Sequence, residues 1–176
     1  SYDFVFIDCP PGVEVLQEVA LKAANNVLTP VKTDDASRTG LGVVASRFES
    51  VQNENLRFIG AVLFGVNRQA TRTLEAARTR LVEDLEDSEA VFTATIRHVE
   101  AAATQARHRG QLAHELEAAA GSQDPWWKGL RGTDPNGASR QDRIPGSAGP
   151  LAEDYFALAE ELLHRIAALD SMEVPA

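Results

Sequence analysis

The stretch that most constrains the fold is residues 2–12, which read Tyr-Asp-Phe-Val-Phe-Ile-Asp-Cys-Pro-Pro-Gly. Val5, Phe6 and Ile7 favour a strand, and because no polar residue alternates with them, we expect this strand to be buried on both faces. Strands of that kind belong to parallel sheets, whose carboxyl ends are the usual place for ligands in α/β proteins. The sequence therefore predicts a parallel sheet with a strand over 4–8 that ends at a binding site.

Asp8 closes this predicted strand, and a rigid turn follows it. Mg²⁺ prefers hard oxygen ligands and often keeps its waters, so a carboxylate here suits a Mg²⁺–nucleotide site. The two prolines fix the backbone, and Gly12 allows a sharp bend or a close approach to a phosphate. A simpler alternative is that Asp8 caps the next helix. Capping accounts for neither the Pro-Pro-Gly turn nor the continuous apolar run.

Strand and helix patterns alternate along the rest of the chain, which argues for a doubly wound, mostly parallel sheet with right-handed crossovers. Strands are expected over 4–8, 26–31, 57–66 and 90–96, and helices over 13–24, 39–51, 70–85, 99–106, 112–120 and 151–169. In the last helix the predicted buried face comprises Leu151, Tyr155, Leu158, Leu162, Ile166 and Leu169, with Glu153, Asp154, Glu160 and Glu161 on or near the other faces.

The composition changes between residues 121 and 150, where glycine, proline, serine and asparagine dominate. We expect three parts: a main α/β body over 1–120, a flexible insert over 121–150, and a terminal helix of the same domain over 151–170. Trp126 and Trp127 lie in the insert, where they either anchor it to the body or meet a partner.

Charge and cysteine content narrow the functional classes. The 176 residues carry 26 acidic and 17 basic side chains, a net charge of -9, so any contact with nucleic acid or an anionic membrane needs a local basic patch. A single cysteine, Cys9, excludes an internal disulfide and suits a reducing cytoplasm. No apolar stretch is long enough to span a membrane.

Residues 2–11 resemble the second nucleotide motif of the ParA/MinD group of ATPases, which reads Tyr-Asp, four apolar positions, Asp, Cys or Thr, and Pro-Pro. Four later stretches resemble that group as well: 25–31, ending in Pro-Val; 40–41, Gly-Leu; 60–68, ending in Asn-Arg; and 153–161 in the last helix. At 96–101, Ile-Arg-His-Val-Glu-Ala stands where the family usually has Ile-Pro followed by Glu-Ala, so Arg97 replaces a proline that normally borders the base.

The resemblance implies a P-loop NTPase fold that uses ATP and Mg²⁺. In that case Asp8 would hold Mg²⁺ through a water, and Pro10, Pro11 and Gly12 would form a switch near the γ-phosphate. Asn67 would read adenine, which an amide with both donor and acceptor can do; a turn residue closing the strand is the alternative. ParA-type members form ATP-dependent homodimers, bind DNA non-specifically and respond to a ParB-type partner in plasmid or chromosome partitioning.

No Gly-x-x-x-x-Gly-Lys-(Ser/Thr) phosphate loop occurs in the 176 residues. That loop supplies backbone N–H groups and a lysine to the phosphates. We therefore expect this chain, the C-terminal part of such an ATPase domain, to be inactive alone and to leave an apolar sheet edge unpaired. A fragment of a complete ATPase and a degenerate copy both fit. The second would be a non-catalytic interaction module.

Arg72, Arg97, Arg107 and Arg109 are candidate DNA contacts, although ordinary solvated arginines fit about as well. A MinD-type positioning role is a further alternative. It is disfavoured because the chain ends in an acidic segment rather than a basic amphipathic membrane helix. The four histidines lack the spacing of a metal site.

Overall fold

The computed structural model of the chain describes residues 2–10, 12–121 and 144–172, without the side chains of 35–39 and Met172. Its elements in chain order are α1 (Glu14–Ala23), β1 (Asn26–Val31), α2 (Asp35–Ser50), β2 (Arg57–Val66), α3 (Thr71–Leu85), β3 (Val91–Arg97), α4 (Glu100–Arg109), α5 (Ala113–Gly121) and α6 (Ala148–Met172).

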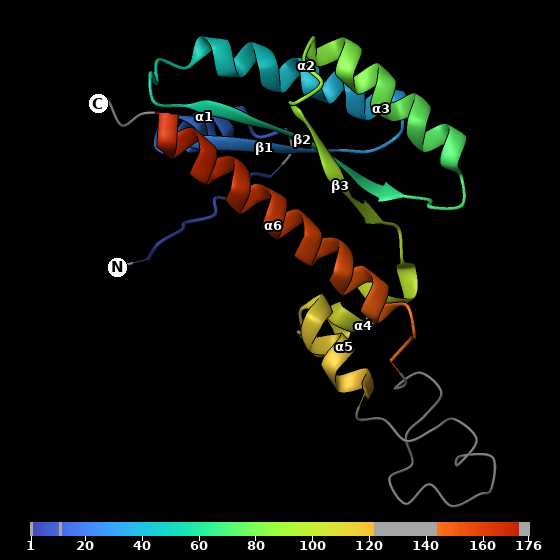
Figure 1. Cartoon of the computed structure of the whole chain (residues 1–176). Coiled ribbons are helices and arrows are strands. Elements are labelled where there is room, and N and C mark those ends of the chain that lie inside the picture. Colours follow the sequence, from blue (N-terminus) through green and yellow to red (C-terminus); the bar gives the residue numbers. More distant parts are fainter. Residues whose placement is uncertain (1, 11, 122–143, 173–176) are drawn as a thin grey trace, which may run out of the picture.

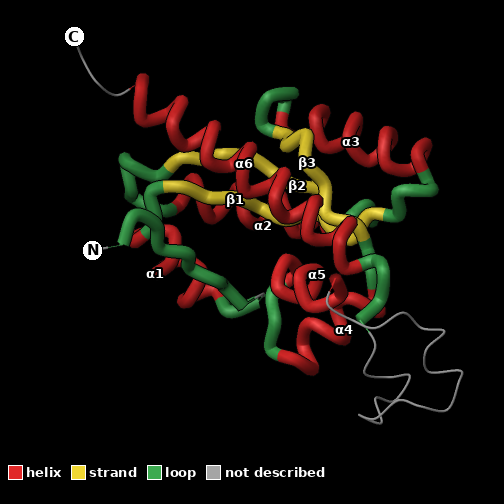
Figure 2. Tube along the Cα trace, turned by 60° about the horizontal axis from the view of Figure 1, so that its bottom comes forward, coloured by secondary structure: helices red, strands yellow, loops and turns green. Residues whose placement is uncertain are grey.

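The sheet has the order β1-β2-β3, and both neighbouring pairs are parallel. The crossover helices α2 and α3 lie on one face of the sheet, and α6 runs across the other (Figures 1 and 2). Successive right-handed crossovers in one direction place their helices on the same side, which accounts for this layering. The predicted α/β fold with a parallel sheet is confirmed.

Two apolar clusters hold the layers together. The first joins the sheet to α2 and α3, and its buried members are Val31, Leu41, Ala61, Leu63, Val66, Leu81 and Val91. The second joins the end of β3 to α4, α5 and the start of α6, and its buried members are Ile96, Ala102, Leu116, Ile144, Ala148 and Leu151. On α3, Leu74, Ala77, Leu81 and Leu85 recur at helical spacing, and all four pack into the first cluster.

The predicted strand over 4–8 is wrong. This segment is extended but lies outside the sheet (Figure 1), and the side chains of Val5 and Phe6 are about four-fifths exposed, at 79% and 81%. A strand needs a neighbour to complete its hydrogen-bond ladder. In the described residues, β1 pairs only with β2, and no ladder bond reaches residues 4–8. The apolar sequence pattern indicates that these side chains suit a buried strand, but a strand also needs a neighbouring strand to pair with.

Helix α1 forms close to its predicted bounds, but the larger apolar side chains that recur along it at helical spacing are not buried. Val15, Leu16 and Val19 are each at least half exposed, and Ala20 is the buried residue of this helix. Together with residues 4–7, these side chains leave an apolar surface on the β1 side of the molecule. The expected uncovered apolar surface is present, although as a loop and a helix face rather than as a strand edge.

The insert predicted over 121–150 overlaps the fold at its end. Trp126 and Trp127 lie outside the described residues, but Ile144 is buried and α6 begins at Ala148, three residues before the predicted 151. In the described part of the chain, no helix is long and apolar enough to cross a membrane.

Acidic and basic side chains of α6 satisfy the backbone of the edge strand β3. The register between β2 and β3 shifts after Ala61, so that Leu63 pairs with Thr95 and the residues between them on β3 bulge from the ladder. Glu161 accepts hydrogen bonds from the N–H groups of Thr93 (2.9 Å) and Ala94 (2.8 Å). The bulge therefore does not leave these amides unpaired against an apolar helix face.

Arg165, one turn further along α6, completes this arrangement. Its guanidinium donates to the carbonyls of Ile59 (3.1 Å) and Val91 (3.3 Å), pairs with Glu161 (2.8 Å) and lies 3.9 Å from the centre of the Phe92 ring. From the other side, Arg78 of α3 donates to the carbonyls of Phe92 and Thr93. Such capping protects a sheet edge from pairing with another chain.

Gly60 is required by a close approach between strands. It follows an irregularity in the β1–β2 register, has φ +138°, and a Cβ there would lie 2.4 Å from the carbonyl oxygen of Ala90. We expect Gly60→Ala to lower the free energy of unfolding by about 3 kcal/mol, from backbone strain and displacement of β3. Gly65→Ala is the control: Gly65 has φ +68° but open space for a Cβ, so about 1 kcal/mol is expected. Urea unfolding of both variants measures this, and equal losses would contradict it.

A second prediction concerns acid stability. Burial raises the pKa of Glu161, but hydrogen bonds from the Ala94 and Thr93 amides and from Arg165 outweigh it and hold the pKa below the ordinary 4.5. A lowered folded-state pKa gives stability that is complete above 4.5 and is lost as the pH falls below it. Glu161→Gln should therefore lower the free energy of unfolding by about 2 kcal/mol near pH 7, and by less at acid pH. Unfolding curves across pH test this against Glu160→Gln, an exposed neighbour. A constant Glu161→Gln deficit at every pH would refute it.

Candidate nucleotide-binding site

The ends of β2 and β3 lie side by side at one edge of the sheet. Val66 pairs with Arg97, and the N–H of His98 donates to the carbonyl of Val66 at 2.9 Å. The residues that follow these two strands, beginning with Asn67 and His98, therefore share the carboxyl edge of the sheet. This is the edge at which parallel α/β sheets bind ligands.

Asn67 forms a tight polar turn at this edge. Its Oδ1 accepts the N–H of Gln69 at 3.0 Å, and its carbonyl accepts the N–H of Ala70 at 3.0 Å. The residue is exposed. Asn67 therefore has the turn role that was predicted as the alternative, but the turn occupies only part of the hydrogen-bonding capacity of its side-chain amide. Nδ2 keeps its donors, and Oδ1 has a second lone pair.

A buried carboxylate lies behind this edge. Asp154 of α6 is only 3% exposed, although the sequence pattern placed it on or near an outer face. Its Oδ2 accepts from the backbone N–H (2.9 Å) and Nε (2.6 Å) of Arg97, and its Oδ1 accepts from Nη2 of Arg97 (2.8 Å) and Nη2 of Arg68 (2.6 Å). One carboxylate thus pairs with two guanidinium groups, one from the loop after β2 and one from the end of β3.

The charge state of this cluster follows from its contacts. Burial raises the pKa of Asp154, but hydrogen bonds from the side chain and backbone of Arg97, with the charges of Arg68 and Arg97, outweigh it and place the pKa below its ordinary value. The hydrogen bond to Asp154 raises the pKa of Arg97. All three groups are therefore charged at neutral pH, and the cluster carries one net positive charge.

Sequence reasoning missed Asp154 because it followed the apolar residues of the last helix. Of the predicted face, Leu151 is buried, Leu158, Leu162, Ile166 and Leu169 are partly buried, and Tyr155 is exposed. The helix also buries Asp154 and partly buries Glu161 and Arg165, which continue the spacing of three and four from Leu151 and Leu158. Charged residues at that spacing, interleaved with leucines, were the available signal. Apart from the Glu161–Arg165 pair within α6, the partners of Asp154 and Glu161 lie more than 50 residues away in the sequence, so the pattern alone could not show that these charges have hydrogen-bond partners in the fold.

The residues around Asp8 stand apart from this edge. Asp8 and Pro10 are exposed, the carbonyl of Pro10 accepts from Gln17 Nε2 at 3.3 Å, and Gly12 has φ +82°, a turn conformation that favours glycine. Pro11 lies outside the described residues. No hydrogen bond or ion pair within the described part of the chain joins residues 2–12 to Asn67.

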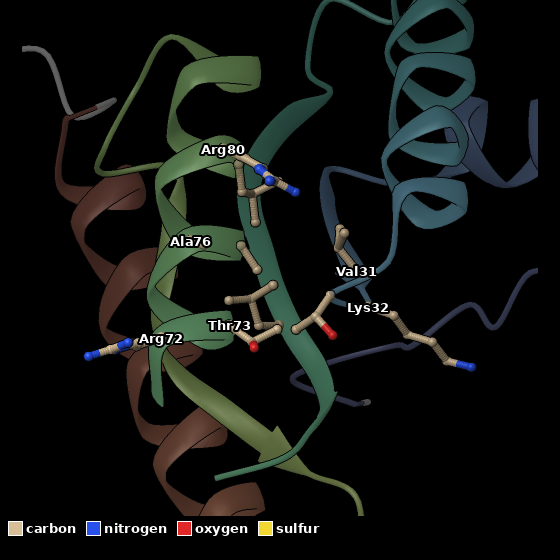
Figure 3. Close-up of a pocket in the computed structure, with 10 residues that line it drawn as sticks. Val31, Lys32, Arg72, Thr73, Ala76 and Arg80 are labelled. Atoms are coloured by element: carbon tan, nitrogen blue, oxygen red, sulfur yellow. The ribbon is translucent and has the colours of Figure 1, made fainter. Parts of the chain in front are cut away.

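The four candidate DNA-binding arginines are not gathered on one surface. Arg97 is committed to Asp154, with its side chain 22% exposed. Arg107 and Arg109 are exposed on the last turn of α4. Arg72 lies beside a hollow of about 300 Å³ between α3 and the end of β1. In Figure 3, Arg72 and Lys32 point away from this hollow on opposite sides, so these two cations do not converge on one anion.

Whether Mg-ATP fits this chain depends on which side chains could bind the metal, the base and the phosphates. Asp8 offers one accessible carboxylate and Asn67 one accessible amide, which suit the metal and the base. The phosphates lack a cradle, because the phosphate-loop pattern is absent from the 176 residues. Among the described residues, no group of three or more His, Cys, Asp or Glu side chains is placed to hold a metal. The residues present therefore offer a carboxylate and an amide of the chemical kind that a metal and a base require, but no phosphate cradle, and no hydrolytic step follows from them.

Comparison with known proteins finds matches to part of the chain. Residues 1–59 match the AAA domain family. The chain is 30% identical over 87 residues to the chromosome-partitioning ATPase Soj of Treponema pallidum (strain Nichols), covering 48% of this chain and 31% of Soj. The chain thus spans about a third of the length of that curated relative. No solved structure matches it significantly. With the parallel α/β fold and the Asp-Cys-Pro-Pro motif, these matches relate the chain to the ParA/Soj-type P-loop ATPases.

Proposed function

We propose that this chain forms the adenine- and metal-facing part of a ParA-type partition ATPase, which binds Mg-ATP as a homodimer. The observation that carries the proposal is the Asn67 turn at the carboxyl edge of the sheet, in a chain that also has the Asp8 motif and matches Soj. Asn67 binds the adenine edge, and Asp8 holds Mg²⁺ through a water. Pro10 to Gly12 form the segment that responds to the γ-phosphate.

The proposed division of labour follows from chemistry. Bound Mg²⁺ supplies charge neutralisation for the phosphates during phosphoryl transfer. The Asn67 amide supplies a donor and an acceptor in a turn that its own hydrogen bonds hold in place. The phosphate-binding loop is not supplied by these 176 residues, so hydrolysis belongs to a complete ATPase in which another segment contributes that loop.

The proposal also includes non-specific DNA binding and a ParB-type partner protein. Arg72, Arg107 and Arg109 would contact phosphates non-specifically, whereas Arg97 is left out because its guanidinium holds Asp154. Local cations can do this despite the overall charge of -9. The proposed setting is the cytoplasm, and the cargo is a plasmid or a chromosome.

One observation favours a second candidate, a non-catalytic interaction module. The apolar side chains of residues 4–7 and of α1 are exposed, and they would suit a protein partner. Nucleotide binding separates the two candidates.

Binding of Mg-ATP to the natively expressed protein tests the main proposal. We expect binding by calorimetry, and at least about tenfold weaker binding in Asp8→Ala because a ligand of Mg²⁺ is lost. Asp3→Ala, an exposed aspartate of the same segment, serves as the control and should bind as the wild type does. Absence of nucleotide binding in the wild type would favour the interaction module instead.

DNA binding is tested by the salt dependence of affinity. Replacing Arg72, Arg107 and Arg109 together by alanine should weaken binding to any duplex sequence and reduce the slope of log K against log salt by up to about 3, near 0.9 for each phosphate contact. The control replaces Lys22, Arg47 and Arg57, the same loss of charge at the α1 and β2-start end of the molecule. Equal effects of the two triple variants would mean that only net charge matters, and the assigned contacts would be wrong.

A further inference from the structure

Two segments that border the candidate base site, the loop after β2 and the end of β3, form ion pairs with the same carboxylate. The loop after β2 contributes Arg68, which follows Asn67 directly, and the end of β3 contributes Arg97. Both guanidinium groups pair with Asp154, which lies 86 residues from Arg68 and 57 from Arg97 in the sequence. A hydrogen bond from the N–H of His98 to the carbonyl of Val66 already joins the ends of the two strands. The ion pairs of Asp154 therefore form a second link, here called the Asp154 tie, between the loop after β2 and the end of β3.

The geometry of this tie leaves little freedom. Arg97 binds through Nε and Nη2 to the two carboxylate oxygens, a bidentate arrangement that fixes the guanidinium plane. The Arg97 backbone N–H donates to the same carboxylate, so the main chain is held as well as the side chain. Arg68 then uses Oδ1 of Asp154, and this ties the Asn67 turn to the same point.

We propose that Asp154 is a positioning residue for the base site. It sets the distance and orientation between the Asn67 amide and the backbone at the end of β3, without touching the base itself. This inference rests on the proposed function, because it concerns the same site. A base is recognised through hydrogen bonds only when the groups that bind it are kept close to one geometry. Buried residues that contact those groups, but not the base, keep them in that geometry.

The chain offers a closely matched control. Glu161 lies two turns further along α6, is also partly buried, and also accepts backbone N–H groups of β3 and an arginine. Asp154 pairs with the strand end and the Asn67 loop, whereas Glu161 pairs with the middle of β3. Asp154→Asn and Glu161→Gln therefore remove one charge each from the same helix–strand contact, but only the first disturbs the base site.

The test compares these two variants in the natively expressed protein, with ATP and GTP as probes. We expect Asp154→Asn to weaken ATP binding by about tenfold, the loss that follows when one hydrogen bond to a ligand is misplaced, and to narrow the preference for ATP over GTP. Glu161→Gln should leave both affinities within twofold. A general loss of stability would not change base preference, so this readout separates positioning from folding.

Amide hydrogen exchange gives a readout that needs no nucleotide. Asp154→Asn should speed exchange at Gln69 and Arg97, whose N–H groups belong to the Asn67 turn and the Asp154 tie. Glu161→Gln should speed exchange at Thr93 and Ala94 instead. Faster exchange at Gln69 in both variants, or in neither, would overturn the inference.

The failures of the two proposals are distinguishable. If Asn67→Ala weakens ATP binding and Asp154→Asn does not, the nucleotide site stands and the positioning role of Asp154 is refuted. If the wild type binds neither ATP nor GTP, the proposed function fails and the inference fails with it.

Discussion

The structure depends on the pairing between α6 and the edge strand β3. Apolar contacts hold this helix against the sheet. Its orientation is fixed by Asp154, Glu161 and Arg165, because each of them forms several hydrogen bonds to backbone or side-chain groups. A buried carboxylate is costly unless its hydrogen bonds are made, and here they are made by groups that would otherwise lack partners themselves. The bulge in β3, the burial of Asp154 and the orientation of α6 are therefore parts of one arrangement.

This pairing makes the two edges of the sheet unlike each other. At β3, carboxylates accept the free N–H groups and arginines donate to the free carbonyls, so the edge is closed. At β1, the neighbouring apolar residues of the first segment and of α1 remain exposed. The candidate base site lies near the closed edge, which suits a site that needs fixed geometry.

Arg97 shows how a departure from a family pattern is accommodated. A proline restricts the backbone covalently and has no N–H to donate. At this position the chain has an arginine whose N–H and guanidinium both bind Asp154, so a network of hydrogen bonds supplies the restriction instead.

The sequence by itself determined the elements whose signal is local. The strands over Asn26–Val31 and Arg57–Val66 could be predicted from local runs of apolar residues, and the helix α3 could be predicted from apolar residues at helical spacing. The candidate roles of Asp8 and Asn67 also came from local motifs. Tertiary structure alone decided two matters. Residues 4–8 do not form a strand, because a ladder requires a neighbour that no local pattern specifies. Asp154 is buried and Glu161 is partly buried, because the cost of burying a charge depends on partners that only the folded chain brings within hydrogen-bond distance.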